Sequence, residues 1–461
     1  LDAGDLASDP INTEDIWVSF DFSGRDLSGN IILTRNADDA VLAGSFSKYT
    51  HYVPFYRYCG SENSGLMEGT WLAMRRTLTL GDTYFRNNKD RLGITSPEVT
   101  LRYGSKIRLY MPSSVVGNGV EGTGGYEGQE GYSLSSKRPF IVTMEIRDTV
   151  SNPLEREGTD VDDFCELNGG LQIYSKGDDD TPATEVPEDP EDPEHPYNET
   201  SKRWVSACDS IPQVYVNVRY NPAEPRDQLS FPAPYHVGYE PYVSEASVRD
   251  IDMQIAEALK KRFHGEGDDY QKYEGVKALE ADSVTLDGTA KIWYIGRFLD
   301  GFIFDTNIDE VKKIIYGEVA QKGTALDYTP SSGGMIQAFY YTIPNLKFGQ
   351  WAELITTSTN AYGSSGKSGS SSSSTSGSSG YSSSYLDYLN YLNYANSYYG
   401  SGGYYGGYYG GYYGNYYGGY YDSMYGYGYD SSSTGTTVTT ITTEIPSFTP
   451  LIFQLYIEPE D

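Results

Sequence analysis

The chain has 461 residues, with 34 Lys and Arg against 64 Asp and Glu, which gives a formal net charge of −30. This acidity excludes the basic surface that a nucleic-acid-binding protein needs, so we expect no nucleic-acid partner. The length predicts two or three domains, and no run of about 18 apolar residues predicts a membrane-spanning helix. The 45 tyrosines and 51 glycines depart from the composition of an average globular domain.

The first segment, residues 1–15, is acidic and interrupted by a proline, and the chain begins at Leu1. We interpret it as an N-terminal tether that follows a removed targeting segment, which predicts an extracytoplasmic protein of the cell envelope. An ordinary frayed terminus explains the same residues nearly as well. Residues 16–150 then contain several runs of alternating apolar and polar residues, which predict a strand-rich domain.

The segment 151–243 is expected to be an acidic, Pro-rich linker with some strand. Its part 155–199 contains 16 acidic residues, and proline alternates with acid in its centre. Proline withholds backbone donors and like charges repel, so this centre should be extended and solvated. The adjacent acids at 178–180 lack the alternate spacing of a calcium loop.

Cysteines and histidines are few and scattered, and no C-x-x-C pair is present. We therefore expect neither a metal site nor a cofactor. Cys165 and Cys208 flank one segment and could form a disulfide in an oxidising compartment. The alternative is that Cys59, Cys165 and Cys208 are three packed thiols.

The last region, 244–461, begins with a predicted leader helix at 244–263, where Val248, Ile251, Ile255 and Leu259 recur at helical spacing. A β-rich domain follows and is interrupted by a low-complexity insertion at 364–440. The insertion begins with a Ser/Gly run and then carries 20 tyrosines between Tyr381 and Tyr429. Such a composition cannot bury a core of its own.

Four motifs follow one another in this last region. A strand ends in Tyr294-x-Gly296, a turn follows at Asp300-Gly301, and Phe304-Asp305 comes next. Downstream stand LKFGQWAELIT at 346–356, NAYG at 360–363 and IPSFTPLIFQLYIE at 445–458. In this order the motifs resemble the signature of FKBP-type peptidyl-prolyl cis-trans isomerases. The helix at 244–263 resembles the leader that precedes this domain in many bacterial members.

The same order recurs in a weaker form in the first domain, at 17–33, 103–119 and 133–148. The chain is therefore similar to a tandem of two FKBP-like domains. This resemblance implies an α+β fold, with a curved antiparallel sheet wrapped on a short helix in each domain. In the first domain Phe22, Ile32, Leu33, Val116 and Val142 replace the family's pocket residues, so we predict that it is catalytically inactive.

The resemblance implies a proline-sized aromatic pocket in the second domain. Rotation about an X-Pro bond breaks no bond, so it requires an apolar cup and oriented donors rather than a nucleophile. The implied catalytic residues are Tyr294, Asp305 and Tyr362, whose hydroxyl would face the carbonyl next to the proline. The implied substrate-binding residues are Phe304, Ile336, Phe339 and Phe453. The alternative is that these side chains form the core of a small β-domain.

Three departures from the family concern this pocket. The region 317–335 is longer and more polar than usual, and Thr342 stands where a glycine is expected. The long insertion also leaves the chain between Tyr362 and Phe453, in the loop that overhangs the pocket.

For function, we expect an FKBP-like subunit of an outer-membrane or cell-surface assembly. It either isomerises or chaperones proline-containing polypeptides through its second domain, or is purely architectural and contacts an envelope complex through residues 381–430. By resemblance, a lipid anchor just before Leu1 would make it a bacterial exported lipoprotein. A weaker alternative is a surface protein that binds glycans through exposed tyrosines.

Overall fold

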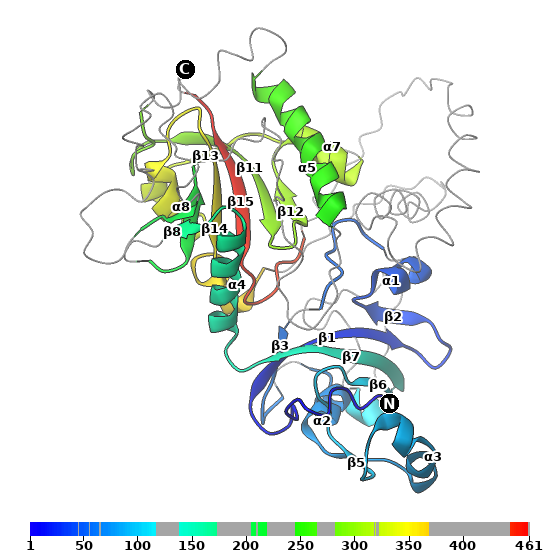
Figure 1. The fold of residues 1–461 in the computed structure, drawn as a ribbon. Coiled ribbons are helices and arrows are strands. Elements are labelled where there is room, and N and C mark those ends of the chain that lie inside the picture. Colours follow the sequence, from blue (N-terminus) through cyan, green and yellow to red (C-terminus); the bar gives the residue numbers. More distant parts are fainter. Residues whose placement is uncertain are drawn as a thin grey trace, which may run out of the picture.

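The computed structural model describes residues 1–44, 46–54, 56–63, 66–116, 138–172, 204–208, 211–218, 245–264, 282–317, 319, 322–367 and 443–459. These residues form three sheets, and the two larger ones, both mainly antiparallel, lie one above the other in Figure 1, with the first domain below. Among them no helix combines the length and the apolar character needed to cross a bilayer. The predicted Tyr-rich contact segment 381–430 and the acids at 178–180 lie outside the described residues.

The first sheet has the strand order β2-β1-β7-β6, with β3 paired to the other end of β1. Its elements are β1 (Ile16–Arg25), β2 (Ile31–Thr34), α1 (Ala37–Ala43), β3 (Tyr56–Cys59), α2 (Glu68–Arg75), β6 (Lys106–Met111) and β7 (Phe140–Val150). An excursion between α2 and β6 consists of β4 (Leu78–Thr79), α3 (Asp82–Leu92) and β5 (Glu98–Val99).

The second sheet has the order β12-β11-β15-β14-β10-β9-β8, with β13 paired to β11. Its strands are β8 (Leu171–Gln172), β9 (Trp204–Ser206), β10 (Val214–Asn217), β11 (Ala290–Phe298), β12 (Ile303–Thr306), β13 (Leu326–Tyr328), β14 (Trp351–Thr356) and β15 (Leu451–Ile457). The helices around it are α4 (Pro153–Leu167), α5 (Glu245–Leu259), α7 (Asp309–Tyr316) and α8 (Gln337–Thr342).

The two domains repeat one topology, because β12-β11-β15-β14 has the same layout as β2-β1-β7-β6. Gly24 pairs with Val142 and Leu33, and Gly296 pairs with Phe453 and Asp305 in the same register. Both hairpins shift register just after this glycine. Their turn glycines, Gly29 and Gly301, have φ values of 91° and 89°. The predicted α+β fold with two FKBP-like domains is confirmed.

Residues 1–15 do not behave as the free tether that we predicted. Ala3 and Ile11 are each only 1% exposed, so the segment buries apolar side chains against the first domain. Its backbone pairs with that domain as well, through an isolated bridge between Asp2 and Lys106 and a bond from Ile11 N to Leu101 O, 3.0 Å long. Burial of these side chains offsets the cost of ordering the segment.

The region predicted as a linker also contributes more folded structure than expected. Helix α4 begins with Asn152 as its N-cap and Pro153 in its first turn, which is a favourable helix start. Its side chains Val161 and Phe164 join the core of the second domain. The predicted strand pairs as β10 with β14 along the whole of Val214–Asn217. Residues 173–200, which hold the Pro-acid centre, lie outside the described part of the chain.

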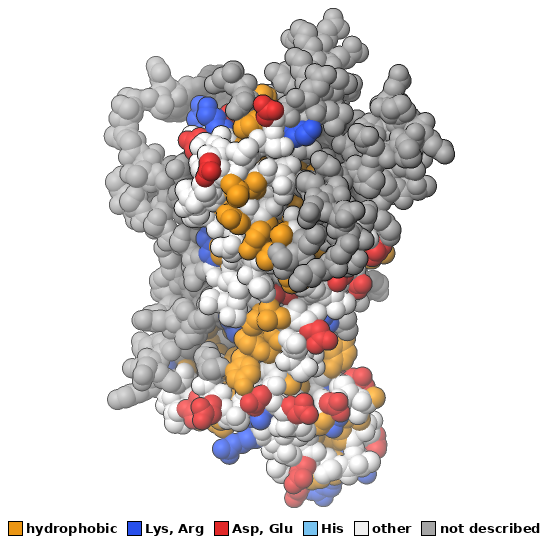
Figure 2. All heavy atoms as spheres, turned by 90° about the vertical axis from the view of Figure 1, so that its left-hand side faces the viewer, with side chains coloured by type: hydrophobic (Ala, Val, Ile, Leu, Met, Phe, Trp, Pro, Cys, Tyr) orange, Lys and Arg blue, Asp and Glu red, His pale blue; other side chains and the backbone are white. Residues whose placement is uncertain are grey.

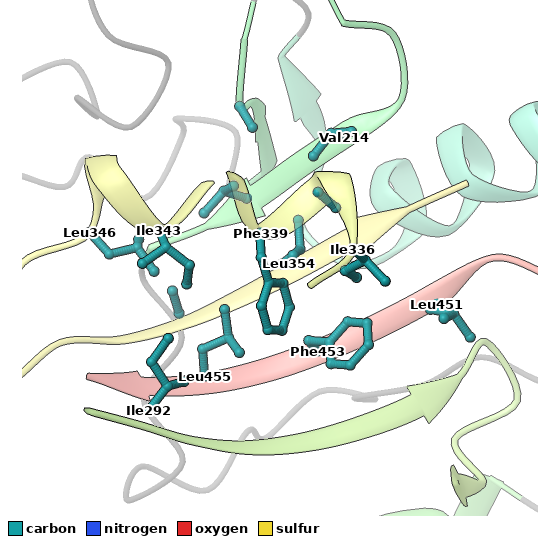
Figure 3. Packing of buried hydrophobic residues seen from close by; sticks show 14 of the residues in the cluster. Val214, Ile292, Ile336, Phe339, Ile343, Leu346, Leu354, Leu451, Phe453 and Leu455 are labelled. Atoms are coloured by element: carbon teal, nitrogen blue, oxygen red, sulfur yellow. The ribbon is translucent and has the colours of Figure 1, made fainter. Parts of the chain in front are cut away.

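The second sheet is packed on both faces. One face carries α4, α5 and α7, and the predicted leader helix buries Ile251, Ile255 and Leu259 there. The opposite face carries α8 and the aromatic cluster that Figure 3 shows. In Figure 1, α5 and α7 accordingly lie on the opposite side of the sheet from α8.

A line of buried polar side chains crosses the sheet on the α5 side. Arg297 donates to Asp252 Oδ1 at 2.5 Å and to Gln454 Oε1 at 3.1 Å. Gln454 donates to Glu353 Oε1 at 2.8 Å, and Asn217 donates to Glu353 Oε2 at 3.2 Å. Because each of these groups has a partner, burial does not leave an isolated charge, and the bonds help to specify the strand register.

Candidate functional site

The aromatic residues predicted to line a pocket converge on Phe453 of β15. Its ring centroid lies 5.7 Å from that of Phe304 on β12, 5.1 Å from that of Phe339 on α8 and 6.4 Å from that of Tyr294 on β11. All three pairs meet edge to face, an arrangement that the aromatic quadrupole favours. Figure 3 shows Phe339 and Phe453 turned toward each other between α8 and the sheet.

These rings are deeply buried. Phe339 is 1% exposed, Phe453 5%, Phe304 6%, and Ile336, just before α8, 8%. Tyr294, Asp305 and Tyr362 are only half-buried. The part of the site that solvent reaches is therefore its polar rim, and the structure brings all seven predicted residues together around one apolar cluster.

A hydrogen bond joins two members of the rim. The Tyr294 hydroxyl donates to Asp305 Oδ2 at 2.9 Å. Burial, the negative charge of Asp305 and this bond all raise the pKa of Tyr294, so its hydroxyl stays protonated. Burial, and after it the charge of Asp305, raises the pKa of Tyr362 as well. Both phenols are thus hydrogen-bond donors at neutral pH.

Local structure around Gly296 sets the spacing between the two rim residues on β11 and β12. A Cβ atom at Gly296 would lie 2.6 Å from Cζ of Phe304, so only glycine lets this ring lie flat over β11. Asn307 then ties the hairpin together, since it accepts from Tyr294 N at 2.8 Å and donates to Ile292 O at 2.9 Å. The Y-x-G and F-D motifs are therefore parts of one rigid hairpin.

A separate turn carries Tyr362 to the site. After β14 the chain makes a short 3-10 turn, η6 (Ser358–Asn360), in which Ala361 N donates to Ser358 O at 2.9 Å. Glu157 of α4 holds the start of this turn, accepting from Ser358 N at 3.1 Å and from Ser358 Oγ at 2.6 Å. Sequence analysis did not identify Glu157, because it is 201 positions from Ser358.

Two further aromatic residues belong to the cluster and were missed. Tyr328 on β13 is 4% exposed, and its ring centroid lies 6.1 Å from that of Phe339. Phe298 at the end of β11 lies 5.1 Å from Phe304. The signal for Tyr328 was present in the alternation of Leu326 and Tyr328, but it lies in the stretch 317–335 that looked too polar for the domain.

The described residues of the first domain form no comparable site. By register Phe22 stands at the position of Tyr294 and Leu33 at that of Asp305, so the rim hydroxyl and carboxylate are absent. The ring of Phe140, which is fully buried, packs directly on Gly24. In α2, Thr70 takes the place that Phe339 has in α8, counting from the residue before each helix. The corresponding space is thus filled from within the domain.

Thr342 and the insertion bear on the second domain. Thr342, expected to be a glycine, is fully buried, and its hydroxyl finds no hydrogen-bond partner among the described residues, which destabilises α8. The insertion leaves after Lys367 and returns before Ile445, and these two residues exchange both backbone hydrogen bonds at 2.8 Å. The base of the insertion is therefore pinned beside the turn that carries Tyr362.

Among the described residues, no group of three or more His, Cys, Asp or Glu side chains could hold a metal ion. Neither Cys165 nor Cys208 is in a disulfide bond, so the pairing that remained open does not form. Burial raises the pKa of Cys59 to about 11 and that of Cys165 well above its usual value. These two thiols are packed and unreactive groups.

No protein-family model matches the chain, and no curated protein matches it. A solved peptidyl-prolyl cis-trans isomerase from Pseudomonas syringae pv. tomato is similar at 15% identity over 39% of this chain and 65% of its own, with a TM-score of 0.17. The chain therefore spans just under two thirds of that structure.

Two further solved structures are similar as well. The three FKBP domains of wheat FKBP73 match at 9% identity over 100% of this chain and 92% of theirs, with a TM-score of 0.19. AtFKBP13 matches at 13% identity over 39% of this chain and 82% of its own, with a TM-score of 0.17. Similarities with TM-scores this low carry no weight, and what the structure shows by itself is that one strand order and one register recur in both domains of the chain.

Proposed function

We propose that the second domain binds proline-containing polypeptides and isomerises X-Pro bonds at the site around Phe453, and that the first domain is not catalytic. The observation that carries the proposal is the joint arrangement of an aromatic cluster with the Tyr294–Asp305 pair and Tyr362 at its edge. Such a site can take an apolar ring on one side and offer donors to a peptide on the other.

The chemistry requires stabilisation of the twisted amide, whose barrier in solution is about 18–20 kcal/mol. The aromatic cluster would hold the proline ring and exclude water from the amide. The Tyr362 hydroxyl, kept protonated by its raised pKa, would donate to the carbonyl next to the proline. Each tenfold acceleration needs only about 1.4 kcal/mol of preference for the twisted form, which one well-placed hydrogen bond can supply.

A specific observation favours a second candidate, an architectural role without turnover. The rings of Phe339, Phe453 and Phe304 are at most 6% exposed, so a proline ring can reach them only if neighbouring groups move. In that case the FKBP-like folds serve to present surfaces. Figure 2 shows hydrophobic side chains in patches along the described part of one face, with acidic and basic ones scattered around them.

The test is an isomerisation assay on a short Xaa-Pro peptide with the full chain, alongside Tyr362→Phe and Asp305→Ala. We expect measurable activity in the wild type and a loss of about tenfold or more in Tyr362→Phe, which removes one hydroxyl and keeps the ring. Phe22→Tyr in the first domain is the matched control and should leave the rate unchanged. A wild type without activity or peptide binding would leave only the architectural role.

The setting of the protein belongs to the same proposal. We place it in the cell envelope as a lipoprotein subunit of a larger assembly, with the Tyr-rich segment 381–430 as its contact surface. The composition of that segment supports this, since tyrosine with glycine and serine is typical of adaptable binding surfaces. Membrane fractionation and cross-linking from the tyrosines would test location and partner together.

A further inference from the structure

The turns that precede the rim residues Asp305 and Tyr362 are each held by a group that comes before the region 244–461 in the chain. Helix α4 directly follows β7, the last strand of the first domain, and supplies Glu157 to Ser358. The loop 46–54 of the first domain supplies His51, whose Nε2 lies 2.6 Å from Asp300 Oδ2. Asp300 begins the turn of the β11–β12 hairpin, and Phe302 N donates to its Oδ1 at 3.0 Å.

The first of these contacts leads to Tyr362 through a short chain of bonds. Glu157 is 2% exposed, and its two carboxylate oxygens accept separately from Ser358 N and Ser358 Oγ. Ser358 O in turn accepts from Ala361 N, the residue before Tyr362. The orientation of the Tyr362 backbone is thus tied to a helix that lies outside the repeated FKBP-like topology.

The second contact leads to Phe304 and Asp305. The His51 ring stacks on Phe298 at 4.8 Å with an interplanar angle of 10°, and on Phe302 at 4.5 Å. Phe298 in turn packs on Phe304 at 5.1 Å. His51 therefore packs against two neighbouring rings of the β11–β12 hairpin, which also carries Asp305.

Helix α4 is itself anchored to the first domain. Arg156 lies 3.6 Å from Asp148 at the end of β7 and donates to Asp160 at 2.9 Å. Tyr56 of β3 also hydrogen-bonds Asp148. A displacement of the first domain would consequently move the group that holds Ser358.

We propose that Glu157 and His51 are positioning residues for the isomerase site, so that the inactive first domain holds the two turns that present Tyr362 and Asp305. This inference rests on the proposed function. Neither residue touches the peptide; each acts through a turn. The first domain then contributes to catalysis without a pocket of its own, which explains why its packing against the second domain is so specific.

The experiment compares the full-length wild type with Glu157→Gln, His51→Asn and Asp163→Asn. Asp163 is an exposed carboxylate on the same helix and serves as the matched control. For each protein, kcat/KM for an Xaa-Pro peptide is measured together with the Kd of that peptide. Glu157→Gln replaces one of the two acceptor oxygens that face Ser358 with an amide donor, and His51→Asn removes the stacking.

We expect kcat/KM to fall about tenfold or more in both variants while Kd changes less than about threefold, because a misplaced orienting group costs rate more than binding. Hydrogen exchange should quicken at 357–362 in Glu157→Gln and at 298–306 in His51→Asn, and neither effect should occur in Asp163→Asn. Ser358→Ala removes a single donor and serves as the milder second variant should Glu157→Gln unfold, with a smaller loss expected.

The outcomes separate the two proposals. An inactive wild type would overturn the proposed function and this inference with it. An active wild type whose Glu157, His51 and Ser358 variants keep kcat/KM would overturn the inference alone. Equal losses of kcat/KM and of peptide affinity would also overturn it, since they would indicate general damage to the fold.

Discussion

The stability of the α4 contact should depend on pH, and Glu157→Gln isolates this dependence. The Glu157 carboxyl is buried against Ser358, with Asp160 as the nearby charged group on its own helix. Burial is the main cause that raises the pKa of Glu157 from 4.5 to about 7, and the bonds from Ser358 only partly oppose it. The folded protein therefore holds a proton here that the unfolded chain releases.

The sign and size of this pH dependence follow from the linkage between proton binding and folding. Between pH 4.5 and pH 7 the folded state binds more protons at Glu157 than the unfolded state, so its contribution to stability is present below this window and is lost as the pH rises through 7. One pKa unit corresponds to about 1.4 kcal/mol, so the full change amounts to about 3 kcal/mol. Glutamine does not titrate, and the stability of Glu157→Gln relative to wild type should rise by about that amount from pH 5 to pH 8.

Urea unfolding at several pH values, followed by tryptophan fluorescence, measures this difference. Asp160, whose pKa is raised to about 6, is present in both proteins, so its own titration largely cancels. Asp163→Asn is the control, and its stability should change with pH in the same way as that of the wild type. If the difference between wild type and Glu157→Gln stays within about 1 kcal/mol from pH 5 to pH 8, the carboxyl is not desolvated and the reasoning is wrong.

Three further variants test the packing. Arg297→Met removes the guanidinium that pairs with Asp252 and should lower the free energy of unfolding in urea by about 3–5 kcal/mol. The double variant Arg297→Met/Asp252→Leu should recover most of this loss. An equal loss in both variants would contradict the buried ion pair. Phe140→Ala should destabilise the first domain by about 3–5 kcal/mol in thermal unfolding, and a negligible shift would show that the space is not filled by this ring. Gly366 has φ 64° and ψ −158°, a conformation that is essentially restricted to glycine, and an added Cβ would lie 2.3 Å from Ile445 O. Gly366→Ala should therefore cost about 3 kcal/mol or more, with faster exchange at the Lys367–Ile445 bridge as the readout.

Local features were predictable from the sequence. The helix at 245–259, the hairpin from Tyr294 to Asp305 and the weaker hairpin from Phe22 to Leu33 rest on periodicity and on motif spacing within about 15 residues. The convergence of Phe304, Phe339 and Phe453 was accessible through the order of motifs, although these residues are far apart in the chain. The helix and each of the two hairpins depend on residue types within a single short segment, whereas the convergence of the three rings was implied by the order of the motifs.

Non-local contacts could not be predicted in the same way. The acidic residues of α4 make its apolar stripe hard to recognise in the sequence. That Val161 and Phe164 are buried follows only from the packing of this helix on the second sheet. The burial of Ile11, the packing of Phe140 on Gly24 and the hold of Glu157 on Ser358 likewise join segments without a shared motif.

The amino-acid sequence by itself determined the two repeated hairpins and the leader helix, because these depend on short-range pattern. The resemblance of its motifs to a known family implied seven residues of the site, but not Phe298 and Tyr328. Tertiary structure alone decided that the N-terminal segment and α4 are folded, that the first domain fills its own hollow, and which groups hold the rim turns. The physical reason is that burial and charge compensation depend on partners brought together in space, and a side chain carries no local mark of the partner that it will meet.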